Sequence, residues 1–181
     1  MNWPKLENIH TIVFDFDGVF TNNKVYLNQY GEEWVQCDRG DGLGFDLIKH
    51  IRKEKNFDFQ LMVLSKEKNS VVAARAKKLG ICCQYGVSNK KKYLDEYFLE
   101  KGFDDPFSGL IYLGNDLNDL PVMRVAGFSV APDDAHILVK ECASVTLGVK
   151  GGDGFIRGFV EKLLNLRDMT PEELDELICN C

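Results

Sequence analysis

The chain has 181 residues, of which 45% are hydrophobic and 28% are charged, as expected for one globular domain with a substantial core. Its formal net charge of -6 argues against nonspecific contact with nucleic acid, and we expect no nucleic-acid partner. No apolar run reaches the length of about 18 residues that spans a membrane, and the N-terminus lacks the apolar region of a signal peptide. These features predict a cytoplasmic protein with no membrane partner.

The 6 cysteines form no pair of CxxC units of the kind that binds zinc. A chain of this length also buries enough surface to fold without disulfide staples. We therefore expect reduced and mostly buried thiols.

The first predicted element is a buried strand over 12–14, a short run of branched and aromatic residues. Two apolar segments at 24–28 and 32–37 flank Gly31 and predict a β-hairpin. Its apolar side chains exceed what one hairpin covers, which indicates a partner surface. The glycines of 39–44 alternate and do not form the G-x-G-x-x-G pattern, so we expect no dinucleotide there.

After these glycines the chain alternates between helices and strands. Asp41 is expected to cap a helix over 43–53, whose apolar residues recur at helical spacing. Further strands are predicted at 59–64, 81–84, 110–113, 128–130 and 144–147, and further helices at 70–79, 90–101, through Met123 and Val125, at 134–139, at 155–166 and after the N-cap Thr170. This order predicts a single α/β domain over 1–181, with a doubly wound parallel sheet, helices on both faces and a hairpin insertion at about 24–37.

Polar residues follow four of the predicted strands and would gather at one rim of the sheet. They are Asp15 and Asp17, then Ser65, then Lys90, then Asn115, Asp116 and Asp119. A carboxylate can attack phosphorus to give an acyl-phosphate, and a neighbouring carboxyl group can protonate the leaving alkoxide. Carboxylate, backbone and amide oxygens suit Mg²⁺, while Ser65 and Lys90 would hold phosphoryl oxygens.

Each of these features also has an ordinary structural explanation. Asp17-Gly18 is a turn signal, Ser65 is a common turn residue, and the lysines at 90–92 suit a solvated helix start. The stretch 114–119 could be an acidic turn that caps a helix. Their order on successive strand ends favours a catalytic set over four coincidences.

The stretch 15–21, Asp-Phe-Asp-Gly-Val-Phe-Thr, resembles the DxDGxxT motif of the haloacid dehalogenase (HAD) superfamily. Ser65, Lys90 and 114–119 are similar to the second, third and fourth motifs of that superfamily. The resemblance spans nearly the whole chain and implies a Rossmann-like core.

The resemblance implies a role for each polar residue at the rim. Asp15 would be the nucleophile, Asp17 the general acid and base, Ser65 and Lys90 the phosphate binders, and Asp119 the residue that orients Lys90. Mg²⁺ would be the cofactor, held by Asp15, the backbone carbonyl of Asp17 and a side chain of either Asn115 or Asp116.

The short hairpin and the lack of a cap-sized insertion look like the small, capless, tetrameric branch of this superfamily. Stretches 86–90, 120–123 and 150–157 are similar to stretches typical of that branch. It contains the phosphatases of 3-deoxy-octulosonate 8-phosphate (KDO-8-phosphate) and of nine-carbon keto acids of the sialic type. It implies a homotetramer in which a neighbouring subunit covers the active site and the hairpin at 24–37 serves assembly.

Two departures from the octulosonate enzymes bear on the metal and the substrate. Asn115 stands where Asp is common, which retains an oxygen ligand but removes a charge. Lys66 and Glu67 stand where Gly-Arg is usual. The first departure bears on metal affinity and rate, and the second points to a different sugar.

The spacing of Glu67, Arg75 and Lys78 resembles that of the nine-carbon 9-phosphate phosphatases. Arg75 and Lys78 lie three apart on one helix and could present two cations to a sugar carboxylate. A solvated basic helix face explains the same two residues equally well. Together with Thr21 and Arg157, these residues make up the expected substrate-binding set.

We therefore expect a Mg²⁺-dependent phosphatase that removes the terminal phosphate of a 2-keto-3-deoxy sugar acid. A nine-carbon 9-phosphate, KDN-9-phosphate or N-acylneuraminate-9-phosphate, is the favoured substrate, and KDO-8-phosphate is the alternative. A non-catalytic oligomerisation module, similar to the domains fused behind CMP-acylneuraminate synthetases, is a further alternative. The presence of both Asp15 and Asp17 argues against it. A phosphotransferase or mutase is disfavoured by the lack of a cap-sized insertion.

Overall fold

The computed structural model describes residues 2–181, and Met1 lies outside the described part. Its centre is a six-stranded sheet in the order β5-β4-β1-β6-β7-β8, in which each neighbouring pair is parallel. The strands are β1 (Thr11–Phe14), β4 (Gln60–Leu64), β5 (Cys82–Gln84), β6 (Leu110–Leu113), β7 (Phe128–Ala131) and β8 (Val145–Thr146). The predicted parallel α/β sheet is confirmed.

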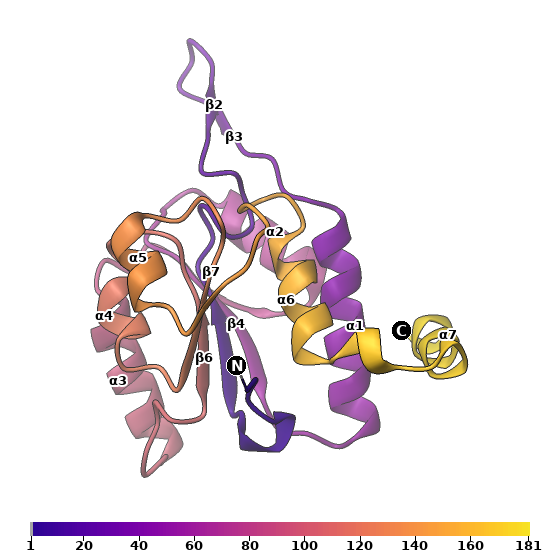
Figure 1. Ribbon diagram of the computed structural model, residues 1–181. Helices are drawn as coiled ribbons and strands as arrows, with labels where there is room; N and C mark the ends of the chain where they lie inside the picture. The colour runs from indigo at the N-terminus through magenta and orange to yellow at the C-terminus, as the bar shows by residue number, and fades with distance from the viewer. Residues whose placement is uncertain (1) are drawn as a thin grey trace.

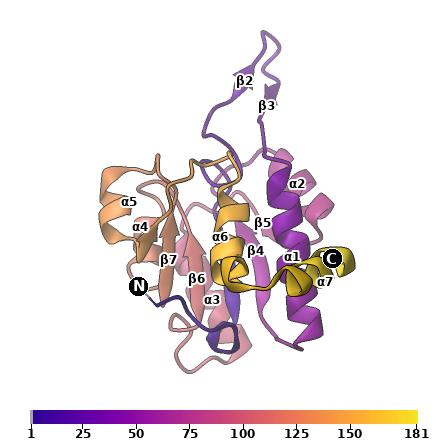
Figure 2. The ribbon, with the colours of Figure 1, turned by 45° about the vertical axis from the view of Figure 1, so that its right-hand side comes forward.

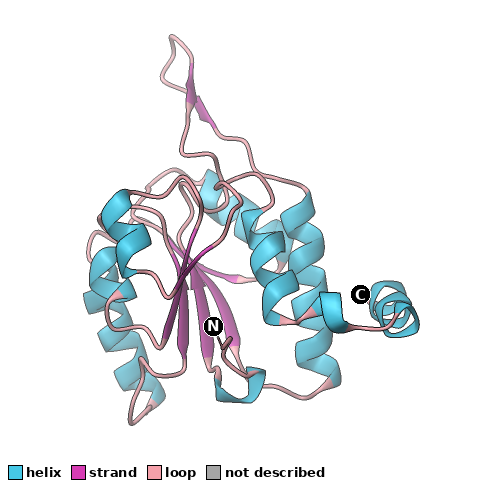
Figure 3. Ribbon diagram, in the orientation of Figure 1, coloured by secondary structure: helices cyan, strands magenta, loops and turns pink. Residues whose placement is uncertain are grey.

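Helices cover both faces of this sheet (Figures 1 and 3). They are α1 (Gly40–Glu54), α2 (Val71–Leu79), α3 (Lys90–Lys101), α4 (Leu120–Met123), α5 (Ile137–Cys142), α6 (Phe155–Leu163) and α7 (Pro171–Asn180), with short 3-10 turns at Leu6–Asn8 and Leu166–Asp168. Ile12 and Phe14 of β1 pack with α1, α2 and α6, whereas Val13 packs with α3, α4 and α5. Strand β1 is therefore buried on both faces, as the central strand of a doubly wound sheet must be.

Aromatic side chains anchor the turn that follows β1. Phe16 and Phe20 are fully buried. The ring of Phe20 stacks on Phe45 of α1 at 5.7 Å, and Phe14 lies 5.1 Å from the same ring. Because these buried rings pack the turn against α1, the polar residues of the turn are held at the carboxyl end of the sheet.

The predicted hairpin is present and projects away from the body of the molecule (Figures 1 and 2). Its strands β2 (Tyr26–Leu27) and β3 (Glu33–Trp34) are antiparallel and shorter than predicted, and a bridge between Thr21 and Cys37 closes the base. Five large hydrophobic side chains of the hairpin are exposed, namely Val25, Tyr26, Leu27, Tyr30 and Trp34. The predicted excess of apolar surface is confirmed.

Three local predictions need correction. Asp41 does not cap α1, because it lies inside the first turn of that helix and the N-cap position is Arg39. Helix α6 ends at Leu163, short of the predicted 166, and Asn165 adopts a left-handed conformation with φ of 53° just beyond it. Helix α5 begins at Ile137, three residues later than predicted.

The described cysteines form no disulfide, but the expectation of mostly buried thiols is wrong. Cys37, Cys83 and Cys142 are half-buried, and Cys82, Cys179 and Cys181 are exposed. Within residues 2–181, none of the helices has the length and apolar character needed to cross a membrane.

Candidate active site

Five of the seven polar residues predicted at the rim line one hollow of about 400 Å³, and Lys90 and Asp119 do not. We call it the catalytic hollow, and its lining comprises Asp15, Asp17, Asn23, Ser65, Lys66, Glu67, Asn115, Asp116, Leu117 and Asn118. Strand β1 lies between β4 and β6 in the sheet, so the ends of these three strands deliver Asp15, Ser65 and Asn115 side by side. The predicted gathering at the carboxyl edge is confirmed.

Lys90 connects two carboxylates beneath the hollow. Its Nζ lies 2.7 Å from Oδ1 of Asp15 and 2.7 Å from Oδ1 of Asp119, and all three residues are buried. Oδ2 of Asp119 accepts hydrogen bonds from the backbone amides of Asn115 and Asp116. Asp119 therefore contacts both the Lys90 ammonium and the loop after β6.

Tyr112 completes this network, and the sequence alone did not reveal it. Its hydroxyl donates to Oδ1 of Asp119 at 2.7 Å, and the residue is fully buried in β6. Burial and the carboxylates of Asp119 and Asp15 raise the pKa of this hydroxyl well above its usual range, so it remains a donor. One signal was available, since a tyrosine within an apolar strand needs a partner for its hydroxyl.

The side chains of Asp15 and Asp17 both have a raised pKa, but different neighbours act on each of them. Burial raises the pKa of Asp15 to about 8, with a further upward effect of Asp119, while Lys90 and the Phe16 amide act in the opposite direction. Burial also raises the pKa of Asp17, as does the neighbouring Glu67. A raised pKa suits Asp17 as a group that holds a proton and then releases it.

The rim offers oxygen ligands for a divalent cation. Oδ1 of Asn115 is buried and has no hydrogen-bond partner among the described residues, so it is free to bind a cation. Gly18 makes room for this amide, since a Cβ there would lie 1.9 Å from Nδ2 of Asn115. The side chain of Asp116 is less suitable, because the residue is exposed and its Oδ1 accepts from the Leu117 amide.

Within residues 2–181, no three His, Cys, Asp or Glu side chains form a metal cluster by themselves. The candidate cation site therefore combines carboxylates with amide and carbonyl oxygens. Asp15, Asn115 and the backbone carbonyl of Asp17 are such a set, and hard oxygen ligands of this kind suit Mg²⁺.

The predicted substrate-binding residues are only partly brought together. Glu67 lines the catalytic hollow. Thr21 is fully buried, and its hydroxyl donates a long hydrogen bond of 3.5 Å to Oδ1 of Asp17. The Arg157 guanidinium donates to Glu161 at 2.6 Å within α6 and does not line the catalytic hollow.

Arg75 and Lys78 lie apart from the catalytic hollow of their own chain. They line a second hollow of about 580 Å³, which we call the basic hollow, together with Cys37, Arg39, Gly42, Leu43, Asp46 and Leu79. Nη2 of Arg75 donates to the backbone carbonyl of Asp38 at 2.9 Å. The helical spacing predicted a shared face for Arg75 and Lys78 correctly, but that face does not point into the catalytic hollow.

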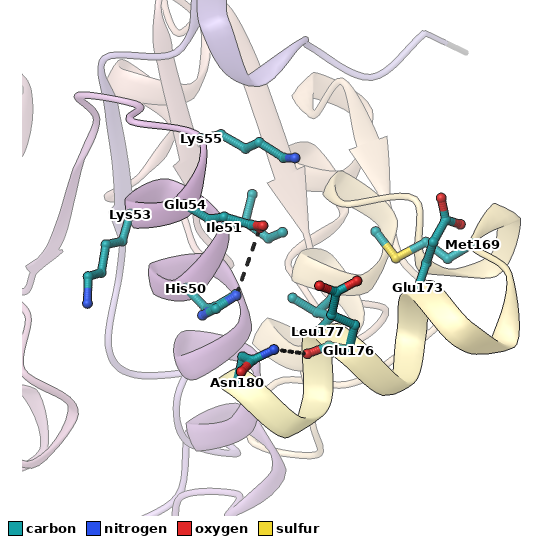
Figure 4. A pocket seen from close by; sticks show the side chains of 10 residues that line it. All are labelled: His50, Ile51, Lys53, Glu54, Lys55, Met169, Glu173, Glu176, Leu177 and Asn180. Carbon is teal, nitrogen blue, oxygen red and sulfur yellow. Dashed lines mark hydrogen bonds and ion pairs between the residues drawn. The ribbon is translucent and has the colours of Figure 1, made fainter.

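A larger hollow, of about 670 Å³, separates α1 from the C-terminal helix α7 (Figure 4). Its lining mixes charged and apolar side chains, among them His50, Glu54 and Leu177, and includes none of the predicted catalytic residues. The size of a hollow therefore does not identify the chemical site in this fold.

No protein-family model matches the chain. The chain is 33% identical to the KDO-8-phosphate phosphatase KdsC of Escherichia coli K12 over 172 residues, which cover 95% of this chain and 86% of that protein. Among solved structures, a HAD family protein from Streptomyces avermitilis has a TM-score of 0.81 and 37% identity, with 94% of this chain and 95% of that chain covered. The cobalt-bound KDO-8-phosphate phosphatase YrbI of Haemophilus influenzae has a TM-score of 0.75 and 31% identity, with 90% and 91% covered.

The raised pKa of Asp15 predicts that Mg²⁺ binding is linked to proton release. With a pKa of about 8 the carboxyl holds a proton at pH 7, and a bound cation must displace it. We expect the dissociation constant for Mg²⁺, measured by isothermal titration calorimetry, to fall by up to about tenfold per pH unit as pH rises from about 6 to 8. Asp15→Asn should bind weakly and lose this pH dependence.

Asp116→Asn is the matched control, since it removes a nearby exposed carboxylate. It should change the dissociation constant by less than about threefold, because water and salt screen an exposed charge that does not contact the cation. A loss of binding in this variant would make Asp116 the ligand in place of Asn115.

Proposed function

Because the chain belongs to the KDO-8-phosphate phosphatase family of the HAD superfamily, we propose that KDO-8-phosphate is its substrate. The chain is a phosphoric monoester hydrolase of the HAD family that acts on a sugar phosphate. The observation that carries the proposal is the Lys90 bridge between Asp15 and Asp119 beside Asp17, in a chain alignable over 95% of its length with an octulosonate phosphatase. The comparisons favour this substrate over the nine-carbon one preferred from Glu67, Arg75 and Lys78.

In the proposed reaction, an oxygen of Asp15 forms a bond to phosphorus while the bond from phosphorus to the sugar oxygen breaks. Asp17 gives its proton to that leaving oxygen. Water then attacks the aspartyl-phosphate, Asp17 takes a proton from it, and inorganic phosphate leaves with Asp15 restored. The raised pKa of Asp17 is consistent with its holding a proton when the substrate arrives.

The groups around Asp15 would hold the phosphoryl group during these steps. The buried Lys90 ammonium and the Ser65 side chain flank the carboxylate and would bind phosphoryl oxygens. Mg²⁺, held by Asp15, the Asp17 carbonyl and Asn115, would neutralise phosphoryl charge when bound. The cobalt-bound form of the Haemophilus influenzae relative supports a divalent metal as the cofactor.

The hairpin supports assembly into a homotetramer. A two-stranded hairpin is marginal alone, and this one exposes Tyr26 at 59% and Trp34 at 63% of their surfaces. In the proposed tetramer a neighbouring subunit covers the catalytic hollow. Arg75 and Lys78 could then reach a substrate only across a subunit boundary, because they line the basic hollow of their own chain.

We also retain a cytoplasmic location as part of the proposal.

The substrate is tested by phosphate release from KDO-8-phosphate and from a sialic-type 9-phosphate measured in parallel. We expect faster turnover of KDO-8-phosphate, loss of activity with a chelator, and recovery when Mg²⁺ is restored. Asp15→Asn should lower kcat by more than about a thousandfold, because it removes the nucleophile. Preference for the nine-carbon substrate would refute the proposed substrate, and full activity of Asp15→Asn would refute the mechanism.

The Tyr112 hydroxyl should contribute to catalysis through Lys90. In Tyr112→Phe, Asp119 loses one of the donors on Oδ1 and should draw Lys90 away from Asp15. A hydrogen bond to a buried charge contributes about 1.5 to 3 kcal/mol, so we expect kcat to fall about tenfold or more. Tyr97→Phe, on the half-buried side of α3, is the matched control and should leave kcat unchanged. Equal kcat for both variants would contradict this role.

The hairpin is tested by Trp34→Ser with light scattering after size exclusion. We expect tetramers to dissociate and kcat/KM to fall, since the neighbour would no longer cover the hollow. Leu99→Ser is the control, because Leu99 is 81% exposed on α3 away from the hairpin. A monomeric parent chain would refute the assembly, whatever the variant does.

A further inference from the structure

Asp41 is a fully buried carboxylate that the catalytic hollow does not use. It lies in the first turn of α1, and its Oδ1 accepts a hydrogen bond from the Arg157 amide at 2.9 Å. Its Oδ2 has no hydrogen-bond partner among residues 2–181. A buried carboxylate with an unmet oxygen is costly, so a fold that keeps one calls for an explanation.

The groups that shift the pKa of Asp41 belong to the loop before α1, to α2 and to α6. Burial raises its pKa to about 6, and Asp38 acts in the same direction. The Arg157 and Ile156 amides of α6 and the Arg75 guanidinium of α2 oppose that rise. At pH 7 the carboxylate is therefore mostly ionised, which suits its place at a helix N-terminus.

Helix α6 has no capping side chain of its own. Its N-cap is Gly154, with φ of 78°, and Arg157 is the third residue of the helix. An N-cap side chain normally accepts from the amide of the second or third residue. Asp41 supplies this hydrogen bond from a position 116 residues earlier in the chain.

Helices α1 and α6 approach each other closely at the hydrogen bond between Asp41 and Arg157. A Cβ on Gly44, one turn after Asp41, would lie 3.1 Å from Cα of Arg157. The N-terminus of α6 is thus placed directly against the first turns of α1 (Figure 2).

The turn that leads into α6 presses against the segment that carries Asp17. A Cβ on Gly151 would lie 1.9 Å from the carbonyl oxygen of Gly18, and the Gly152 amide donates to the carbonyl of Val19 at 3.1 Å. A shift of α6 must therefore move the segment 18–22 as well.

That segment holds the general acid through Thr21. The Thr21 hydroxyl accepts from the Gly18 and Asn23 amides at 3.2 and 3.1 Å and donates to Oδ1 of Asp17. Its backbone also bridges to Cys37, which leads into the first turn of α1. Asp41 thus lies on α1, which follows Cys37, and bonds to α6, whose preceding turn packs against the segment 18–22.

We propose that Asp41 is a positioning residue for the reaction. By capping α6 from α1, it holds Gly151 and Gly152 against the segment 18–22 and keeps the Thr21 hydroxyl on Asp17. The inference rests on the roles of Asp15 and Asp17 proposed above, and it adds a residue that acts on them through the backbone.

The test compares Asp41→Ala, which removes the acceptor, with Asp41→Asn, which retains an oxygen that can accept from the Arg157 amide. We expect Asp41→Ala to lower kcat for phosphate release about five- to tenfold with KM changed less than about twofold. Asp41→Asn should keep at least about half of the parent kcat, since the cap is retained. Glu54→Ala, at the exposed far end of the same helix, should leave kcat unchanged.

A double variant separates positioning from a general loss of stability. If Asp41 acts through Thr21, Asp41→Ala should cost little further kcat in a Thr21→Val background, because the hydroxyl is already missing. Fully additive losses would overturn the proposal. So would equal losses in Asp41→Asn and Asp41→Ala.

A second readout does not depend on turnover. Hydrogen exchange of the segment 17–23, followed by mass spectrometry, should accelerate in Asp41→Ala and match the parent in Asp41→Asn. If the parent chain releases no phosphate, the proposed function fails, and hydrogen exchange of the segment 17–23 then tests by itself whether Asp41 positions that segment. If Asp41→Ala does not fold, Asp41→Ser, too short to reach the amide, takes its place. Unchanged exchange in the variant lacking the cap would overturn the inference.

Discussion

The candidate site depends on one buried cation held between the buried carboxyl groups of Asp15 and Asp119. Lys90 lies 2.7 Å from both Asp15 and Asp119, and an unpaired charge at such depth would be costly. Each partner is in turn satisfied by neighbours, Asp119 by Tyr112 and by two amides of the loop after β6. The ends of β1 and β6 and the start of α3 are thus tied together by one network. The same contacts that make these charges tolerable also direct Lys90 toward Asp15, the proposed nucleophile.

The sequence predicted the parallel sheet and the catalytic hollow because their signals are local. A short apolar run ending in Asp15 and Asp17 marks a strand and its chemistry within a few residues. Tyr112 was missed because a hydroxyl inside an apolar strand reveals no partner until the fold brings Asp119 beside it. Asp41 was assigned to the wrong helix, since the capping rule considers only the nearest amides, whereas its partner Arg157 is far along the chain. What the sequence could not supply was contact between distant segments.

Arg75 and Lys78 show a second limit of sequence patterns. Spacing of three residues predicts that two side chains share a helix face, but it does not say what that face meets. In this fold the face of α2 meets the basic hollow beside Arg39, while Glu67 remains at the catalytic hollow. The pattern formed by Glu67, Arg75 and Lys78 is therefore divided between two surfaces of one chain. In the proposed tetramer, a second copy of the chain would bring the parts of this pattern together on one substrate.

The amide of Asn115 adds an oxygen ligand at the rim without adding a negative charge beside Asp15. Asp15 already has its pKa raised to about 8 by burial and by Asp119, and Lys90 is the one ammonium that contacts either carboxylate within residues 2–181. A further carboxylate at position 115 would raise that pKa more in the absence of metal, since like charges disfavour ionisation. An amide supplies the same kind of oxygen ligand without this repulsion, but it attracts a cation less strongly. In the proposed site, Asn115 therefore lowers the affinity for metal but lets Asp15 ionise more readily, and its Oδ1, which has no hydrogen-bond partner among residues 2–181, keeps a ligand position open.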